Sequence, residues 1–181
     1  MSHIYILIGT KAQYIKMAPV MVALQKTEKS YSVIDLSQHG SMGRGMLASF
    51  GVDPRIHIPF TKEKPVDTIG KGIAWLLKTA MVLLQSKKSI LQRLFVHGSG
   101  TVLVHGDTMS TFLGILFAKR VGFTVALVEA GLRSGQMFSP FPEEIVRRFA
   151  EKMCDTLYAP GEVEFRNLVK RFPRKRIFNT N

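Results

Sequence analysis

Acidic side chains stand at the points where predicted strands end and helices begin. Asp107 follows one run of apolar residues, and Glu129 closes the next such run. Because the carboxyl ends of parallel strands meet at one edge of a sheet, we expect both carboxylates at the same rim. Glu143 and Glu144 follow a loop stiffened by prolines and open another predicted helix. Three acidic positions on neighbouring loops predict proton transfer or metal binding.

Each acid also has a simpler interpretation. Asp107 could cap the helix that follows it, although Thr108 could do so in its place. The two glutamates near position 143 suit the positive end of a helix dipole. Glu129, at the end of an apolar strand, would be half buried and must be paired, protonated or bound to a ligand. Arg133, four residues later, is its predicted partner.

Basic and polar residues follow the first predicted strand. Gly9 and Thr10 lead a loop that contains Lys11 and Lys16, where backbone N–H groups and a helix dipole can meet an anion. The spacing matches neither glycine-rich phosphate fingerprint, so a plain turn with solvated lysines is an equal alternative. His105 either packs in the core or shuttles protons beside the acid that follows it.

The elements that must position these residues alternate between strand and helix. We expect strands at 4–8, 32–36, 55–58, 101–105, 124–129, 156–159 and 177–178, and helices at 15–27, 43–50, 66–95, 110–120, 143–152 and 162–171. This order predicts an α/β fold, a Rossmann-like three-layer sandwich around a parallel sheet. Residues 1–181 read as one domain, and the final strand and loop look like a boundary between domains.

Composition narrows the class of protein. The 181 residues are 46% hydrophobic and 21% charged, which indicates a soluble globular protein. We expect no signal peptide, no transmembrane segment and a cytoplasmic location, because no apolar stretch approaches the roughly 20 residues that span a bilayer. The single Cys154 excludes an internal disulfide and is expected to pack as a small hydrophobe. Five scattered histidines predict no metal site.

The net charge of +12 points either to nucleic acid or to a small anionic ligand. Basic residues are spread along the chain, with one dense patch at 170–176. No helix-turn-helix, zinc finger or aromatic RNA-binding signature accompanies this patch, so a solvated face is the favoured interpretation and nucleic acid is not an expected partner.

Taken together, the motifs resemble the N-terminal half of the UDP-N-acetylglucosamine 2-epimerase family. They occur in the family's order at Gly9-Thr10, Ile15 to Pro19, Gln38-His39, His105 to Thr108, Glu129 to Gly135 and Ser139 to Glu144. Each motif alone is weak, but the combination is specific, and it covers nearly the whole chain.

The resemblance implies one half of a two-domain, glycosyltransferase-B-like (GT-B) enzyme that acts in cell-surface polysaccharide biosynthesis. Such enzymes interconvert UDP-GlcNAc and UDP-ManNAc by elimination and re-addition of UDP, and hydrolysing relatives release ManNAc. It implies no cofactor and no metal, a UDP-binding C-terminal domain absent from this chain, and a possible homodimer. The catalytic positions would be Asp107, Glu129 and Glu143. The substrate-binding positions would be Gly9, Thr10, Lys11, Lys16, Gln38, His39, His105, Arg133 and Arg147.

This chain also departs from the family's motifs. The family's usual Gly-Thr-Arg-Pro-Glu loop is Gly-Thr-Lys-Ala-Gln here. Lys11 therefore replaces an arginine, which can donate two parallel hydrogen bonds, and Gln13 replaces a carboxylate. Val146 replaces an asparagine, and Gly40 to Met42 replace residues of an allosteric site in some bacterial members. These changes favour an alternative, a non-catalytic domain that binds a nucleotide sugar or a protein.

Overall fold

Seven strands form one parallel sheet, in a computed structural model that describes residues 3–36, 42–53, 57–59, 68–95, 97–135 and 142–181. Their order across the sheet is β3-β2-β1-β4-β5-β6-β7, and every neighbouring pair is parallel. The strands are β1 (His3–Ile8), β2 (Tyr31–Asp35), β3 (His57–Pro59), β4 (Gly100–His105), β5 (Thr124–Val128), β6 (Thr156–Ala159) and β7 (Arg176–Asn179).

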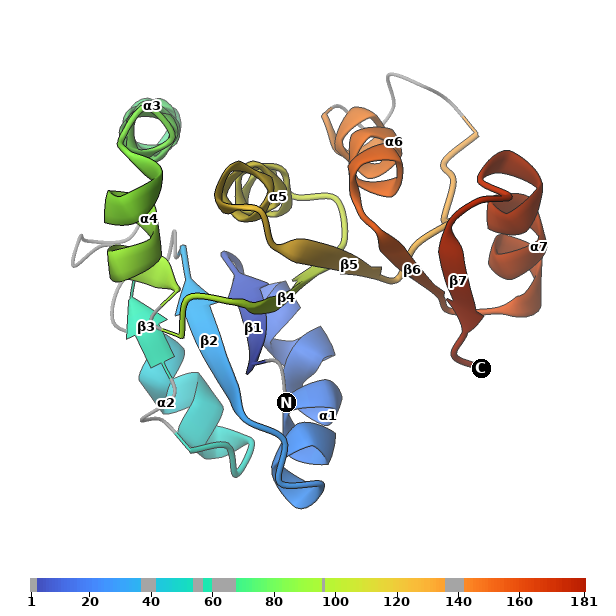
Figure 1. Cartoon of the computed structure of the whole chain (residues 1–181), viewed down its shortest axis with the longest axis horizontal. Helices are drawn as coiled ribbons and strands as arrows, with labels where there is room; N and C mark the ends of the chain where they lie inside the picture. The colour runs from blue at the N-terminus through green and yellow to red at the C-terminus, as the bar shows by residue number, and fades with distance from the viewer. Residues whose placement is uncertain (1–2, 37–41, 54–56, 60–67, 96, 136–141) are drawn as a thin grey trace.

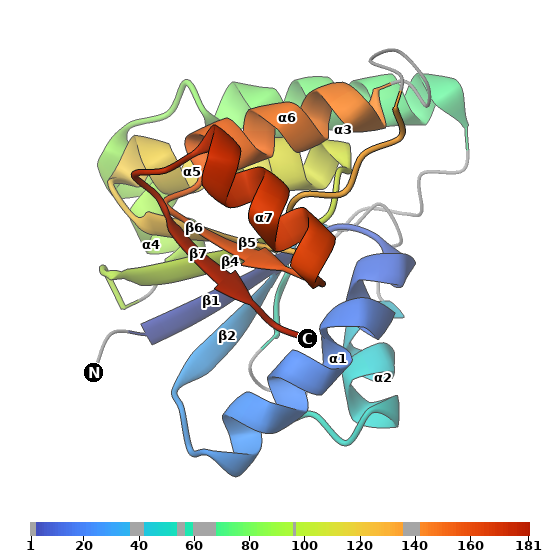
Figure 2. The ribbon, with the colours of Figure 1, turned by 90° about the vertical axis from the view of Figure 1, so that its right-hand side faces the viewer.

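Helices cover the two faces of the sheet unequally. They are α1 (Lys11–Lys26), α2 (Met42–Ser49), α3 (Ile69–Val82), α4 (Lys87–Leu94), α5 (Met109–Val121), α6 (Glu143–Met153) and α7 (Glu162–Arg171). Figure 1 shows α3, α4, α5 and α6 above the sheet and α1 and α2 below it. Helix α7 packs against β6 and β7 at the far edge, as the turned view in Figure 2 also shows. The predicted three-layer α/β sandwich is confirmed.

Two separate apolar clusters hold these layers together. The larger lies between the sheet and α3 to α6, and it includes the fully buried Phe95 and Phe117. The smaller lies under β1 and β2, where Met17 and Met21 of α1 are also fully buried. Cys154 is buried in the larger cluster, as the sequence predicts for a small hydrophobe. The apolar runs of the central strands follow from this burial on both faces.

The strand order places a topological switch point between β1 and β4. From β1 the chain moves outward through β2 and β3, and β4 then returns to the other side of β1. Loops diverge at the carboxyl ends of two such strands, which leaves a crevice in which open α/β sheets bind ligands. Thr10 and His105 lie at or just beyond these strand ends, and Glu129 follows the neighbouring strand β5.

Two predicted helices have different limits in the structure. Helix α1 begins at Lys11, four residues before the expected start, because Thr10 accepts a hydrogen bond from the Gln13 N–H and caps it. The expected helix over 66–95 is two helices, since Ser86 caps a new one after the turn at 83–86. No helix in the described part of the chain is long and apolar enough to cross a membrane.

Candidate active site

A small pocket occupies the switch point. It has a volume of about 190 Å³ and takes its lining from the start of α1, the β4–α5 turn, the end of β5 and α6. The lining residues are Thr10, Ala12, Gln13, Lys16, His105, Gly106, Asp107, Thr108, Glu129, Leu132 and Arg147. Helix α1 points its N-terminal end at this pocket, so its dipole favours an anion there.

Glu129 is an acid at the pocket with an unusual backbone conformation. Its φ angle is 62°, in the left-handed region that residues with a Cβ seldom adopt. This conformation turns the carboxylate toward the N-terminal half of the chain. Lys16 Nζ donates to both carboxylate oxygens, at 2.9 and 2.7 Å, and His105 Nε2 lies 2.9 Å from one of them. The predicted partner Arg133 is not among these contacts.

His105 is both buried and bonded. Burial lowers the pKa of His105 below its ordinary value and Lys16 acts in the same direction, whereas Glu129 and Asp107 oppose them. The imidazole is therefore neutral near pH 7, and its Nε2–H donates to the Glu129 carboxylate. Burial agrees with the core interpretation of His105, and proton transfer by its ring stays a prediction.

Asp107 meets a different cation. Its carboxylate contacts the Arg147 guanidinium, and a second nitrogen of Arg147 donates to buried Glu144 at 2.7 Å. Asp107 does not cap α5, because the Thr108 side chain accepts from the Thr111 N–H instead. Asp107 thus lies at the pocket wall, where its charge is neutralised by an arginine that lines the same pocket.

Behind the pocket, arginines neutralise two fully buried carboxylates. Glu151 accepts from Arg133 and Arg171, and Glu144 accepts from Arg147 and from Arg148 at 3.0 Å. Burial alone would raise the pKa of Glu144, but the Ser134 N–H and the nearby guanidinium groups lower it below its usual range. The sequence analysis overlooked this network. Arg133 holds α6 against the β5 turn and is not among the residues that line the pocket.

Three other predicted site residues, Gly9, Lys11 and Glu143, are not among the residues that line the pocket. Lys11 is exposed at the first position of α1, and Gly9 lies beneath the pocket with its N–H bonded to the Gln13 side chain. Glu143 begins α6 one turn before Arg147, and one of its carboxylate oxygens is buried without a hydrogen-bond partner among the described residues. Gln38 and His39 lie outside the described residues.

Gln13 is the residue whose importance sequence reasoning missed. Its buried amide contacts the first turn of α1 and the end of β4, and together with Thr10 it forms a capping box. The Thr-x-x-Gln spacing is itself a recognised helix-start pattern and offered the signal. A metal cluster of three or more His, Cys, Asp or Glu side chains is absent from the described part of the chain.

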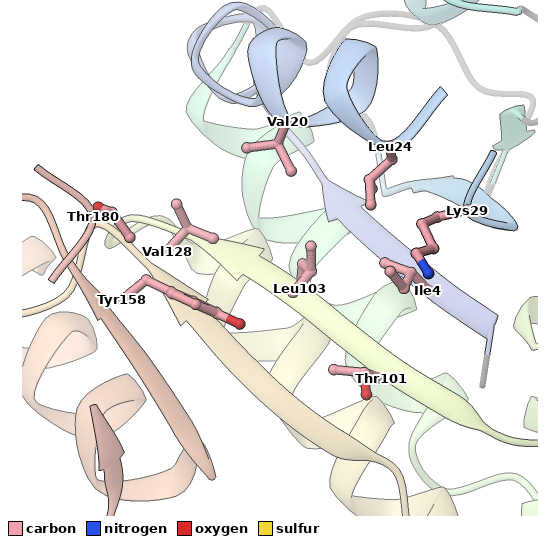
Figure 3. Close-up of a pocket in the computed structure, with 9 residues that line it drawn as sticks. All are labelled: Ile4, Val20, Leu24, Lys29, Thr101, Leu103, Val128, Tyr158 and Thr180. Carbon is pink, nitrogen blue, oxygen red and sulfur yellow. The ribbon is translucent and has the colours of Figure 1, made fainter. Parts of the chain in front are cut away.

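A larger hollow elsewhere carries no such chemistry. It has a volume of about 750 Å³, and Figure 3 shows its lining side chains between α1 and Thr180. Aliphatic side chains such as Val20, Leu24 and Leu103 dominate its lining. Among the described residues that line it, Lys29 carries a charge and none carries a carboxylate. Size alone therefore does not identify the reactive site.

Comparison with known proteins gives a consistent result. The family model described as UDP-N-acetylglucosamine 2-epimerase matches residues 22–180. The UDP-N-acetylglucosamine 2-epimerase of Bacillus subtilis (strain 168) is 34% identical over 163 residues, which make up 90% of this chain and 40% of that protein. The chain thus spans less than half the length of this curated relative.

Solved structures show the same partial coverage. The UDP-GlcNAc 2-epimerase from Neisseria meningitidis bound to UDP-GlcNAc superposes with a TM-score of 0.76 at 29% identity, over 98% of this chain and 45% of that one. A spinosyn rhamnosyltransferase complexed with thymidine diphosphate has a TM-score of 0.50 at 14% identity, over 88% of this chain and 45% of its own. This second likeness concerns the fold alone and agrees with half of a GT-B fold.

Proposed function

The chain belongs to the UDP-N-acetylglucosamine 2-epimerase family, and we propose that it forms one wall of an active site that interconverts UDP-GlcNAc and UDP-ManNAc. The observation that carries this proposal is Glu129. Its left-handed backbone places a carboxylate against Lys16 and His105 at the switch point of the sheet. Strain of this kind is retained where a side chain must reach a particular place.

The proposed reaction begins with loss of the proton on C2 of the sugar. The C1–O bond breaks, UDP leaves with the electron pair, and re-addition of UDP and a proton on the other face of C2 gives the epimer. Asp107, Glu129 and Glu143 are the acids proposed for proton transfer, with His105 able to relay a proton to and from Glu129. Lys16 lies beside the carboxylate and the positive end of α1, where it suits a phosphate oxygen.

The size of the pocket supports a shared active site. About 190 Å³ is smaller than the roughly 300–1,000 Å³ of a site that encloses a drug-sized ligand, so UDP-GlcNAc does not fit within this wall alone. We propose that the part of the relatives that this chain does not match supplies a UDP-binding domain, and that the 181 residues alone are inactive. A single wall leaves the reacting sugar in water.

Two further features complete the proposal. We propose that the protein acts in the cytoplasm, and that it forms a homodimer. Helix α3 supports the dimer, because Ile73, Leu77 and Met81 are more than half exposed at intervals of four residues and form one apolar stripe.

A non-catalytic domain that binds a nucleotide sugar is the second candidate. Gln13 favours it, since the family's usual loop has a carboxylate at this position, and Val146 is buried where the family has an asparagine. A hydrolysing enzyme that releases ManNAc and UDP is a variant of the first proposal.

Joining this chain to the second half of the Bacillus subtilis relative tests these alternatives. We expect the fusion in D₂O to convert UDP-GlcNAc into UDP-ManNAc that carries deuterium at C2, and the matched Glu129→Gln fusion to lose most of this activity. Free ManNAc would identify the hydrolysing variant. Binding of UDP-GlcNAc without either product would identify the non-catalytic domain and contradict the epimerase proposal.

A further inference from the structure

We propose that Gln13 is the positioning residue of this site, and that its uncharged amide locks the first turn of α1 to the β4–α5 turn. This inference depends on the proposed function in one respect, namely that the pocket is an active site. Its geometry and its test require no substrate. Gln13 is 2% exposed, so its contacts are made away from water.

The oxygen end of the amide holds the start of α1. Gln13 Oε1 accepts from the Gly9 N–H at 2.8 Å and from the Thr10 N–H at 3.1 Å. Both partners are backbone donors and cannot accept, so this end of the side chain must be an acceptor. A third donor, the Ser110 hydroxyl, lies at 3.3 Å and brings in the first turn of α5.

The nitrogen end holds the β4–α5 turn. Gln13 Nε2 donates to the His105 carbonyl at 2.6 Å, with the hydroxyls of Thr111 and Thr108 at 2.9 and 3.1 Å. The carbonyl can only accept, and the Thr111 hydroxyl already donates to it at 2.7 Å. This end must therefore be a donor, and among residues of this length only glutamine provides both ends without a proton from solvent.

The two turns locked in this way carry the groups that meet at Glu129. Lys16 lies on the helix that Gln13 starts, and His105 is the residue whose carbonyl Gln13 holds. A shift of the β1–α1 turn would change the 2.7 Å contact of Lys16 with the Glu129 carboxylate, and a shift of the β4–α5 turn would change the 2.9 Å contact of His105. Gln13 itself contacts no part of Glu129, so it acts by positioning other groups.

A carboxylate at this position would behave differently. In a Gln13→Glu variant, one oxygen would face the His105 carbonyl and could satisfy it only as a protonated acid. Burial beside an acceptor raises the pKa of such a group, so the folded state keeps the proton while the unfolded chain loses it. Folding stability then falls as the pH rises from the unfolded pKa to the higher folded pKa.

The test compares Gln13→Glu, Gln13→Met and Gln25→Glu in the purified 181-residue chain. Gln25 is an exposed glutamine on the same helix and provides the matched control. We expect the melting temperature of Gln13→Glu to fall further below that of the parent at pH 8 than at pH 5. The deficit of Gln13→Met should change much less between the two pH values than that of Gln13→Glu, and Gln25→Glu should show neither effect.

The ring of His105 supplies the second measurement. By NMR titration, we expect the midpoint for His105 to move toward that of free histidine, about 6.5, in Gln13→Met. Thr111→Val removes one acceptor of the Gln13 amide and should move the His105 midpoint in the same direction by a smaller amount. It serves as the milder variant if Gln13→Met does not fold. An unchanged midpoint in both folded variants, or a Gln13→Glu deficit that is independent of pH, would show that Gln13 only fills space. Neither outcome depends on whether the chain binds UDP-GlcNAc.

Discussion

At the scale of single residues, Glu129 combines backbone strain with a position at the pocket. A left-handed conformation costs a residue with a Cβ roughly 1–2 kcal/mol more than glycine. We therefore expect Glu129→Gly to unfold at a higher urea concentration than Glu129→Ala, the reverse of the usual order of glycine and alanine. Both variants should bind UDP-GlcNAc at least tenfold more weakly than the parent. A Glu129→Ala variant that is the more stable of the two would contradict the inference of strain.

Two buried histidines predict how stability depends on pH. Burial lowers the pKa of His105, and burial with the nearby His97 lowers the pKa of His3, from the ordinary 6.5. The unfolded chain therefore binds protons first as the pH falls. The contribution of these groups is complete above pH 6.5 and is lost as the pH falls from 6.5 through the lower folded values. Urea unfolding at pH 7.5, 6.5 and 5.5 should show decreasing midpoints, whereas an increase on acidification would contradict this assignment.

The sequence predicted part of the site for a physical reason. Asp107, His105 and Glu129 follow parallel strands, and the strand ends bring them to one rim without knowledge of any side-chain contact. The same argument could not identify the partners of Glu129. Arg133 was predicted from its spacing of four residues, but residues at this spacing are neighbours only within a helix. The chain after Glu129 turns through Gly131 with φ 98°, and Arg133 reaches Glu151.

At the scale of elements, the site depends on close contact between the β1–α1 and β4–α5 turns. A Cβ on Gly9 would lie 2.2 Å from the Cβ of Ser110, which is far too close. We expect Gly9→Ala to lower the free energy of unfolding by about 1–3 kcal/mol, as overpacking of a buried contact does. Denaturant unfolding measures this loss.

The second residue of this contact supplies a control. Because Ser110→Gly removes the opposing Cβ, the double variant Gly9→Ala/Ser110→Gly should lose less stability than the two single changes added together. Strict additivity of the two losses would mean that the two turns do not meet at these atoms.

Helix limits show what the hydrophobic pattern leaves open. The region after Thr68 carries apolar residues continuously enough to predict one long helix, yet α3 ends at Val82 and α4 starts at Lys87. This turn contains no glycine or proline. Its only sequence signal is Ser86, which caps the start of α4. The start of α1 was predicted four residues too late, because the hydrophobic pattern does not register the cap at Thr10.

At the scale of the whole molecule, the stripe on α3 predicts self-association. Leu77 lies midway between Ile73 and Met81, so a two-fold axis near Leu77 pairs Ile73 of one copy with Met81 of the other. We expect light scattering to detect a dimer that Leu77→Glu abolishes. Val163→Glu, a change at another exposed apolar residue, is the control and should leave the dimer intact.

Salt provides an independent check on this dimer. Each copy carries a net charge of +12, and screening of this repulsion should strengthen association between 50 and 300 mM salt. A parent chain that stays monomeric at 100 μM in 300 mM salt would contradict the assignment of α3 as a dimer surface.

The proposed function requires that the rim of β1, β4 and β5 binds the sugar nucleotide. An NMR titration of the 181-residue chain with UDP-GlcNAc tests it most directly, with UDP and GlcNAc as separate controls. We predict shifts of the Lys16, Asp107 and Glu129 amides at millimolar UDP-GlcNAc, because one wall of the site still provides their contacts. A folded chain in which these amides stay fixed, or in which only Leu103 and Tyr158 of the apolar hollow respond, would contradict the account.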